Sequence, residues 1–89
     1  MDAARPLTIL YFAWLRERVG TAEETVQRPA DIRTVAGLIG WLRQRSPGHD
    51  AAFENARVIR CAVNGEFADA AAALGDGDEI AFFPPVTGG

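Results

Sequence analysis

The chain has 89 residues and a mass of 9.6 kDa, and 48% of its residues are hydrophobic and 24% charged. This composition excludes a disordered, collagen-like or coiled-coil chain, and the length allows one domain with too small a core to enclose a substrate, so a self-contained enzyme is not expected. The net charge of −3, with no basic stripe to neutralise phosphates, makes nucleic acid an unexpected partner.

The first predicted element is a strand over Leu7–Ala13, preceded by a flexible N-terminal extension over residues 1–6. Strand periodicity places alternate residues on opposite faces: Leu7, Ile9, Tyr11 and Ala13 against Thr8, Leu10 and Phe12. Both faces are largely apolar, so the strand is either central or exposes one face to a partner protein. The apolar run is shorter than the about 20 residues that span a bilayer, and no signal-peptide cleavage site follows it, so no membrane partner is expected.

Two short elements are predicted next: a helical turn over Trp14–Val19 that stops at Gly20, and a strand over Glu24–Arg28. The clearest helix starts after a Thr34 N-cap and runs to about Arg45. Its apolar face is set by residues at helical spacing: Val35, Leu38, Ile39 and Leu42. Pro47 and Gly48 are expected to end this helix.

An irregular connection over His49–Ala56 is expected after this helix, followed by a strand over Val58–Val63. The two-residue turn Asn64-Gly65 then leads to a short returning strand over Glu66–Ala68. A crossover over Asp69–Leu74 and a tight turn over Gly75–Asp78 precede the last strand, Glu79–Phe83. Phe53 is expected to anchor the connection in the core. Asn64 and Gly65 favour a type I′ hairpin turn because both tolerate positive φ.

This order predicts an α+β fold, in which a small mixed sheet carries one main helix on one face. If the first and last strands are adjacent at the centre, the arrangement is the β-grasp, or ubiquitin-like, fold, and residues 7–83 form it.

Within this domain the sequence indicates no catalytic machinery and no metal site. Cys61 lies between aliphatic residues of a strand and is expected to be a small core residue. As the single cysteine it cannot form an internal disulfide, which favours a reducing, cytoplasmic setting. His49 is expected to be a solvated loop residue, and one histidine with one cysteine cannot build a zinc site.

The sequence ends in a predicted extended tail: Pro84, Pro85, Val86, Thr87, Gly88 and Gly89. Its two prolines are expected to project the chain from the sheet as a stiff segment. Gly88 and Gly89 have no side chains, so they can thread a narrow channel in another protein. The Gly89 carboxylate can be activated as an acyl-adenylate and captured by a sulfur or nitrogen nucleophile. The alternative is a frayed terminus without function.

The run Asp76–Gly89 (DGDEIAFFPPVTGG) resembles the C-terminus of the small subunits of molybdopterin synthase, a family of ubiquitin-like sulfur carriers. Leu10–Ala13 with the following Leu15–Glu17 resembles the family's first strand. Thr34-Val35 and Ala62–Asn64 also fit, so the resemblance covers nearly all of the chain after Pro6.

The resemblance implies a cycle of sulfur transfer. A separate ATP-dependent, E1-like activating enzyme adenylates the Gly89 carboxylate, and a persulfide donor converts it to a thiocarboxylate. The tail then enters the large synthase subunit, where the sulfur attacks a cyclic pyranopterin monophosphate (precursor Z) to form the molybdopterin dithiolene. The chain itself binds no cofactor, and the catalytic residues lie on the large subunit. The implied assembly is a heterotetramer of two small subunits with a dimer of large ones.

A docking surface is predicted on the outward face of the sheet. Phe83 shares this face with Phe12, and Phe67 on the returning strand joins them in an exposed aromatic patch. The resemblance implies that the large subunit contacts these same positions. Leu10 is expected to be more covered than Phe12. The alternative is that one or more of these phenylalanines belongs to the core.

Three other functions remain open. A thiamine-type sulfur carrier has the same fold, Gly-Gly end and chemistry, although the Phe82–Thr87 run argues against it. A ubiquitin-like modifier would be conjugated through Gly89, but the nine basic residues are all arginine, so the chain cannot form lysine-linked polymers of itself. An interaction module with an inert tail is the third.

Overall fold

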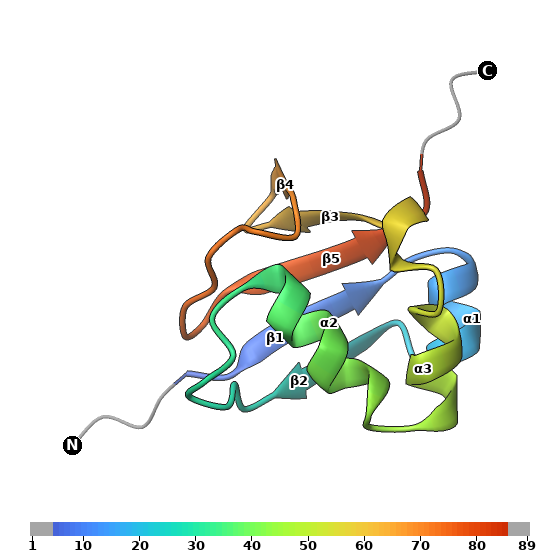
Figure 1. Ribbon diagram of the computed structural model, residues 1–89, viewed down its shortest axis with the longest axis horizontal. Coiled ribbons are helices and arrows are strands. Elements are labelled where there is room, and N and C mark those ends of the chain that lie inside the picture. The colour runs from blue at the N-terminus through green and yellow to red at the C-terminus, as the bar shows by residue number, and fades with distance from the viewer. Residues whose placement is uncertain (1–4, 86–89) are drawn as a thin grey trace.

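The structure, a computed structural model, describes residues 5–85 (Figure 1). Its elements in chain order are β1 (Leu7–Tyr11), α1 (Trp14–Val19), β2 (Glu23–Val26), α2 (Val35–Arg43), α3 (Pro47–Ala52), the 3-10 turn η1 (Ala56–Val58), β3 (Arg60–Val63), β4 (Glu66–Ala68) and β5 (Glu79–Phe83). The predicted tail residues Val86, Thr87, Gly88 and Gly89 lie outside the described residues.

The strands form one mixed sheet in the order β2-β1-β5-β3-β4. β1 and β5 are parallel neighbours in the middle, with Ile9 opposite Ile80, and every other pairing is antiparallel. A sheet whose first and last strands pair in parallel at its centre, with the helices between them in sequence, is the β-grasp arrangement, so the predicted fold class is confirmed.

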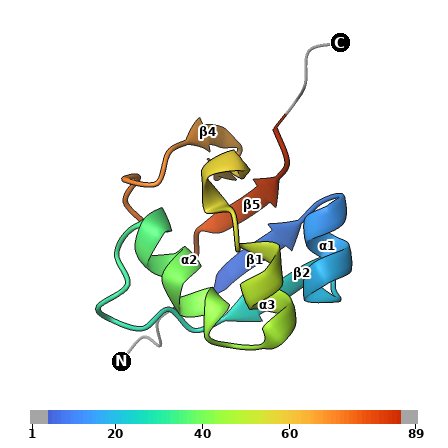
Figure 2. The same ribbon diagram turned by 45° about the vertical axis from the view of Figure 1, so that its right-hand side comes forward.

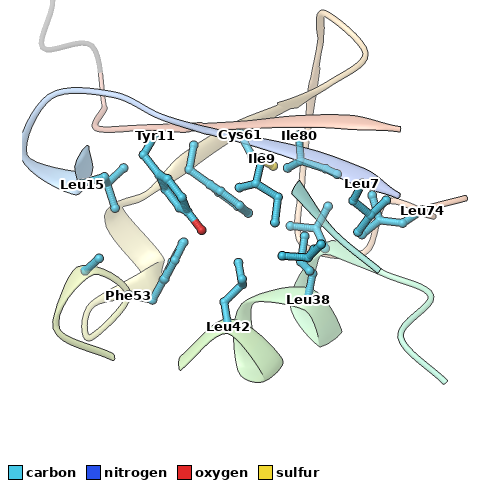
Figure 3. Packing of buried hydrophobic residues seen from close by; sticks show 14 residues of the cluster. Leu7, Ile9, Tyr11, Leu15, Leu38, Leu42, Phe53, Cys61, Leu74 and Ile80 are labelled. Atoms are coloured by element: carbon cyan, nitrogen blue, oxygen red, sulfur yellow. The ribbon is translucent and has the colours of Figure 1, made fainter. Parts of the chain in front are cut away.

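The core lies between the sheet and the helices, which cover one face of it (Figure 3). Ile9, Tyr11 and Ile80 point from the sheet toward Leu38 and Leu42 of α2, and all five are buried. Phe53 is fully buried as predicted, and its ring meets that of Phe82 edge-on with centroids 4.9 Å apart. The alternating burial of β1 and β5 therefore places one face of each strand in the core and leaves the other face without a helix.

The first predicted strand is two residues too long. β1 ends at Tyr11 because the backbone turns at Ala13, where φ is 56°, and α1 begins at Trp14. The predicted end of α1 at Gly20 is confirmed, since Gly20 adopts the left-handed conformation and donates its backbone N–H to the Arg16 carbonyl. The Thr34 N-cap of α2 is also confirmed, because its hydroxyl accepts the Gly37 N–H at 3.1 Å.

A helix was not expected where α3 forms, and the predicted irregular connection over His49–Ala56 is wrong in its first half. The Ser46 hydroxyl caps α3 by accepting the His49 N–H, and Pro47 occupies the first turn, where its missing N–H costs nothing. α2 ends already at Arg43. Pro47 therefore starts a helix of its own rather than ending the preceding one.

His49 is buried and is not the solvated loop residue predicted from the sequence. Its Nδ1 lies 2.7 Å from the Ser46 hydroxyl, and its Nε2 lies 2.7 Å from a carboxylate oxygen of Glu24 in β2. Tyr11 donates its phenolic O–H to the same oxygen. The ring thus packs α3 against the sheet through a satisfied polar network.

The third strand begins at Arg60 rather than Val58, because Ala56–Val58 coils into η1. The hairpin that follows is confirmed: Asn64 and Gly65 both have positive φ, at 51° and 84°. The Asn64 side chain also accepts the Glu79 N–H and donates to Asp78, which fixes the hairpin to the start of β5.

The alanine-rich crossover to β5 supplies hydrogen-bond acceptors to the first turn of α2. The backbone N–H groups of Val35 and Ala36, which have no partner within the helix, donate to the carbonyls of Ala72 and Ala70.

In the described residues, no helix is long and apolar enough to cross a membrane. Over residues 5–85, no group of three or more metal-ligating side chains comes together.

Candidate functional site

The candidate site begins where β5 ends. β5 is the central strand, hydrogen-bonded on both sides, and the fully buried side chain of Phe82 fixes it to the core. Pro84 and Pro85 follow at once, and neither can continue a sheet ladder. The chain therefore leaves the sheet from its central strand, close to η1, drawn in yellow in Figures 1 and 2.

The face of the sheet opposite the helices presents a row of apolar side chains. The register aligns residues of four neighbouring strands across this face: Leu10, Ala81, Ala62 and Phe67. The first three are partly buried by their neighbours, whereas Phe67 is 85% exposed. Leu10 is more covered than the 48%-exposed Phe12, as predicted. Apolar surface gathered on one uncovered sheet face is typical of a protein interface.

Two of the three predicted aromatic residues are brought together. The rings of Phe67 and Phe83 meet with centroids 6.0 Å apart and an interplanar angle of 61°. Phe83 is partly buried, whereas the side chain of Phe67 in β4 is 85% exposed, so the pair projects from the sheet into solvent. We call these two residues the aromatic corner.

Phe12 lies just past β1 on the same side of the sheet and at the same end as the aromatic corner. Its backbone N–H donates to the Phe82 carbonyl at 3.1 Å, and this bond extends the pairing of β1 with β5 beyond Tyr11. The geometry thus places Phe12, Phe67 and Phe83 around the point from which the tail departs. The alternative that these rings are core residues does not hold for Phe12 or Phe67.

Cys61 is a core residue, as the sequence predicts, and it lies on the helix side of the sheet. Burial, and to a smaller extent the charge of Asp69, raises the pKa of its thiol, so the reactive thiolate is disfavoured. Its Sγ donates to the Ala68 carbonyl at 3.4 Å. The described residues therefore offer a platform for docking, and the one thiol among them is poorly suited to attack a substrate.

Comparisons with known proteins agree with this geometry. The model of the ThiS family matches residues 9–89. The molybdopterin synthase sulfur carrier subunit of Escherichia coli (strain K12) is 40% identical over 83 residues, which are 93% of this chain and 99% of that protein. The resemblance noted in the sequence to this family of sulfur carriers is thus confirmed.

Solved structures share the fold over nearly their whole length. A putative molybdopterin converting factor, subunit 1, from Pyrococcus furiosus superposes with a TM-score of 0.76 and is 29% identical, covering 93% of this chain and 100% of that one. The small archaeal modifier protein 1 of Haloferax volcanii has a TM-score of 0.70 and 32% identity, covering 92% and 99%. Since the family model extends from β1 through the Gly-Gly end and the β-grasp order is present, this chain belongs to the ThiS family.

Proposed function

We propose that this chain is the sulfur carrier subunit of a molybdopterin synthase and acts in molybdenum cofactor biosynthesis in the cytoplasm. The observation that carries the proposal is the position of the aromatic corner, beside Phe12 and at the root of the Pro84-Pro85 segment. The identity to a curated sulfur carrier subunit over nearly the full chain supports the same function.

The working atom in this proposal is the carbonyl carbon of Gly89. An activating enzyme uses ATP to form an acyl-adenylate there, with release of pyrophosphate. A persulfide donor then attacks the carbonyl, and the bond to AMP breaks to give an acyl disulfide. A thiol cleaves the sulfur–sulfur bond, forms a disulfide with the donor and leaves a thiocarboxylate on Gly89. The sulfur attacks a carbon of the cyclic pyranopterin monophosphate, and a carbon–oxygen bond of that carbon breaks. Water then hydrolyses the acyl link and returns the carboxylate, and two loaded chains in turn supply the two sulfurs of the dithiolene.

The contribution of this chain is reach and placement. Six extended residues from Pro84 span about 20 Å, enough to enter the cleft of a large subunit. Gly88 and Gly89 are small enough to pass a narrow channel. Val86 and Thr87 connect the two prolines to these glycines and contact the partner. The acid, base and phosphate-binding groups belong to the partner, so the chain needs no cofactor of its own.

Intact-mass measurement tests the proposal. After co-expression with the activating enzyme and a persulfide donor, we expect a mass gain equal to one sulfur replacing one oxygen. Matched controls are deletion of Gly89 and addition of one alanine after it, which displace the reacting carboxylate but leave residues 5–85 intact. Both variants should melt at the wild-type temperature and show no mass gain. A normal gain in either variant would overturn the role of Gly89.

A second candidate, a ubiquitin-like modifier, is favoured by the 32% identity to a small archaeal modifier protein. The same experiment separates it, because conjugation through Gly89 shifts the chain to a far larger covalent species. A thiamine-type carrier would show the sulfur gain but fail to form molybdopterin with a large synthase subunit. No change in mass would favour an interaction module with an inert tail.

A further inference from the structure

A groove that the proposed sulfur chemistry does not use lies between α2 and the β3–β4 end of the sheet. Its volume is about 580 Å³, within the range of about 300–1,000 Å³ usual for binding pockets. Its apolar lining comes from both layers of the fold: Val35, Ile39, Ile59, Cys61 and Phe82. We call it the α2–β3 groove.

The groove is open because small side chains stand where a core would need large ones. Alanines line it from four segments: Ala36, Ala56, Ala68 and Ala70. β4 is only 3 residues long, and the chain after it turns away to hydrogen-bond the start of α2. The sheet therefore ends before it can cover the apolar flank of α2, and Ile39 remains partly exposed.

Three charged residues line the groove: Arg57, Arg60 and Asp69. Arg57 belongs to η1, and Arg60, the first residue of β3, donates to the Arg57 carbonyl. Neither guanidinium forms an ion pair with any residue in the described part of the chain. Asp69 directly follows Ala68, the partner of Cys61 in the sheet, so it lies beside the start of β3, and its carboxylate accepts the Ala71 N–H. An anionic group of an occupant is thus complementary to these two guanidinium groups, which have no ion-pair partner among the described residues.

Arg60 connects the groove to the candidate docking surface. Arg60 is paired with Phe83 across the sheet, and Phe82, the residue before it, forms part of the groove lining. Ala68 in the lining directly follows Phe67 of the aromatic corner. Successive residues of a strand face opposite sides, so the groove and the aromatic corner lie on opposite faces of the sheet. Arg60 lies beside Phe83 at the root of the tail, where a protein that receives the tail can reach it.

We propose that the large synthase subunit inserts an apolar side chain into the α2–β3 groove and places a carboxylate against Arg57 and Arg60. The inference rests on the proposed function and adds a second anchor to it, on the opposite side of the sheet edge from the aromatic corner. Burial of the apolar side chain supplies affinity, and the carboxylate fixes the orientation of the partner.

Binding of purified large subunit, measured by isothermal titration calorimetry, tests the groove directly. Ala36→Leu fills it from an exposed position on α2, and the double variant Arg57→Glu/Arg60→Glu reverses its charge. We expect each to weaken binding about tenfold or more. Matched controls are Gly40→Leu, on α2 where an added side chain meets open space, and Arg33→Glu, an exposed arginine outside the groove lining. Both should bind within about twofold of wild type.

Methyl NMR of the complex gives a second readout. We expect nuclear Overhauser contacts from the Ile39 and Ile59 methyl groups to protons of the large subunit. Groove variants that keep the wild-type melting temperature and bind as tightly as wild type would overturn the inference. A dimer of this chain that the Ala36→Leu variant dissociates would also overturn it, because the groove would then be occupied by a second copy. A small molecule retained by the chain in native mass spectra would overturn it in the same way.

The two proposals fail in different ways. If the thiocarboxylate forms and the wild-type chain binds the large subunit, but the groove variants bind equally well, only the groove inference is wrong. If the wild-type chain neither gains sulfur nor binds the large subunit, both are wrong.

Discussion

At the residue scale, one carboxylate joins three elements of the fold. Glu24 accepts hydrogen bonds from the Tyr11 hydroxyl at 2.6 Å and from His49 Nε2 at 2.7 Å, and Arg45 lies 3.4 Å from its other oxygen. The Ser46 hydroxyl accepts the His49 N–H, which leaves its own proton for His49 Nδ1. His49 therefore donates through Nε2 to Glu24.

The electrostatics of Glu24 predict a pH dependence of stability. Burial acts to raise its pKa, but the hydrogen bonds from Tyr11 and His49 and the nearby positive charges outweigh burial, so the pKa lies below its ordinary value. A carboxyl whose pKa is depressed by folding stabilises the fold above its unfolded pKa, about 4.3. That contribution is lost as the pH falls through the lower, folded value.

Urea unfolding of wild type and Glu24→Gln checks this prediction. The difference in free energy of unfolding between the two should be largest near neutral pH and shrink as the pH falls below about 4. Tyr11→Phe removes one of the donors and should cost about 1–3 kcal/mol at neutral pH, with a weaker pH dependence than wild type. Parallel pH profiles for wild type and Glu24→Gln would show that this network does not set the pKa.

At the scale of elements, two glycines in neighbouring helices have opposite roles. Gly40 lies in α2, and a methyl group added there meets no atom within 4 Å. Gly40→Ala should therefore raise the free energy of unfolding by about 0.5–1 kcal/mol, because alanine loses less conformational entropy on forming a helix. Thermal and urea unfolding measure the gain, and an unchanged or lower stability would contradict it.

Gly48 provides the contrasting variant. It lies in α3 against the C-terminal half of α1, and an added methyl group would collide with the backbone carbonyl oxygen of Arg18. The helix propensity of alanine acts in the same direction as at Gly40, but α1 and α3 would have to separate, so Gly48→Ala should be destabilising. Because the two substitutions should change the free energy of unfolding in opposite directions, the comparison separates the effect of helix packing from that of helix propensity.

The elements that the sequence predicted well are those with a local signal. The spacing of Val35, Leu38 and Leu42 and the Thr34 cap predicted α2, and the Asn64-Gly65 turn predicted the hairpin. The sequence does not predict α3, because a proline that favours the end of one helix is equally favoured in the first turn of the next. The serine before it carried a signal that could have found this helix.

The features that the sequence did not predict depend on contacts between residues that are distant in the chain. The sequence does not predict the burial of His49, because its partner Glu24 is distant in sequence and no periodicity links the two residues. Alternation along β5 did predict that Phe83 faces outward, and the hairpin register brought Phe67 to it. The groove has no sequence signal, because it depends on where β4 stops relative to α2. The roles of Val86–Gly89 stay predictions.

At the scale of the whole molecule, the two faces of the sheet have separate tasks. The helices lie on one face of the sheet, which they bury (Figure 2). The other face carries Phe12 and the aromatic corner. β5 belongs to both, since Phe82 points into the core and Phe83 away from it. A side chain on the uncovered face can therefore be changed with little effect on folding, which allows docking to be tested apart from stability.

Phe67→Asp uses this separation. Phe67 is 85% exposed, so the variant should melt within a few degrees of wild type, yet burying an unpaired aspartate in the interface should weaken binding of the large subunit. We expect a loss of about 2 kcal/mol, or roughly thirtyfold in Kd. Phe67→Leu keeps an apolar group at the corner and should lose far less. Calorimetric titration of both variants, with melting curves on the same samples, measures the effect. An unchanged Kd for Phe67→Asp would mean that the large subunit binds elsewhere and that the aromatic corner is not its docking surface.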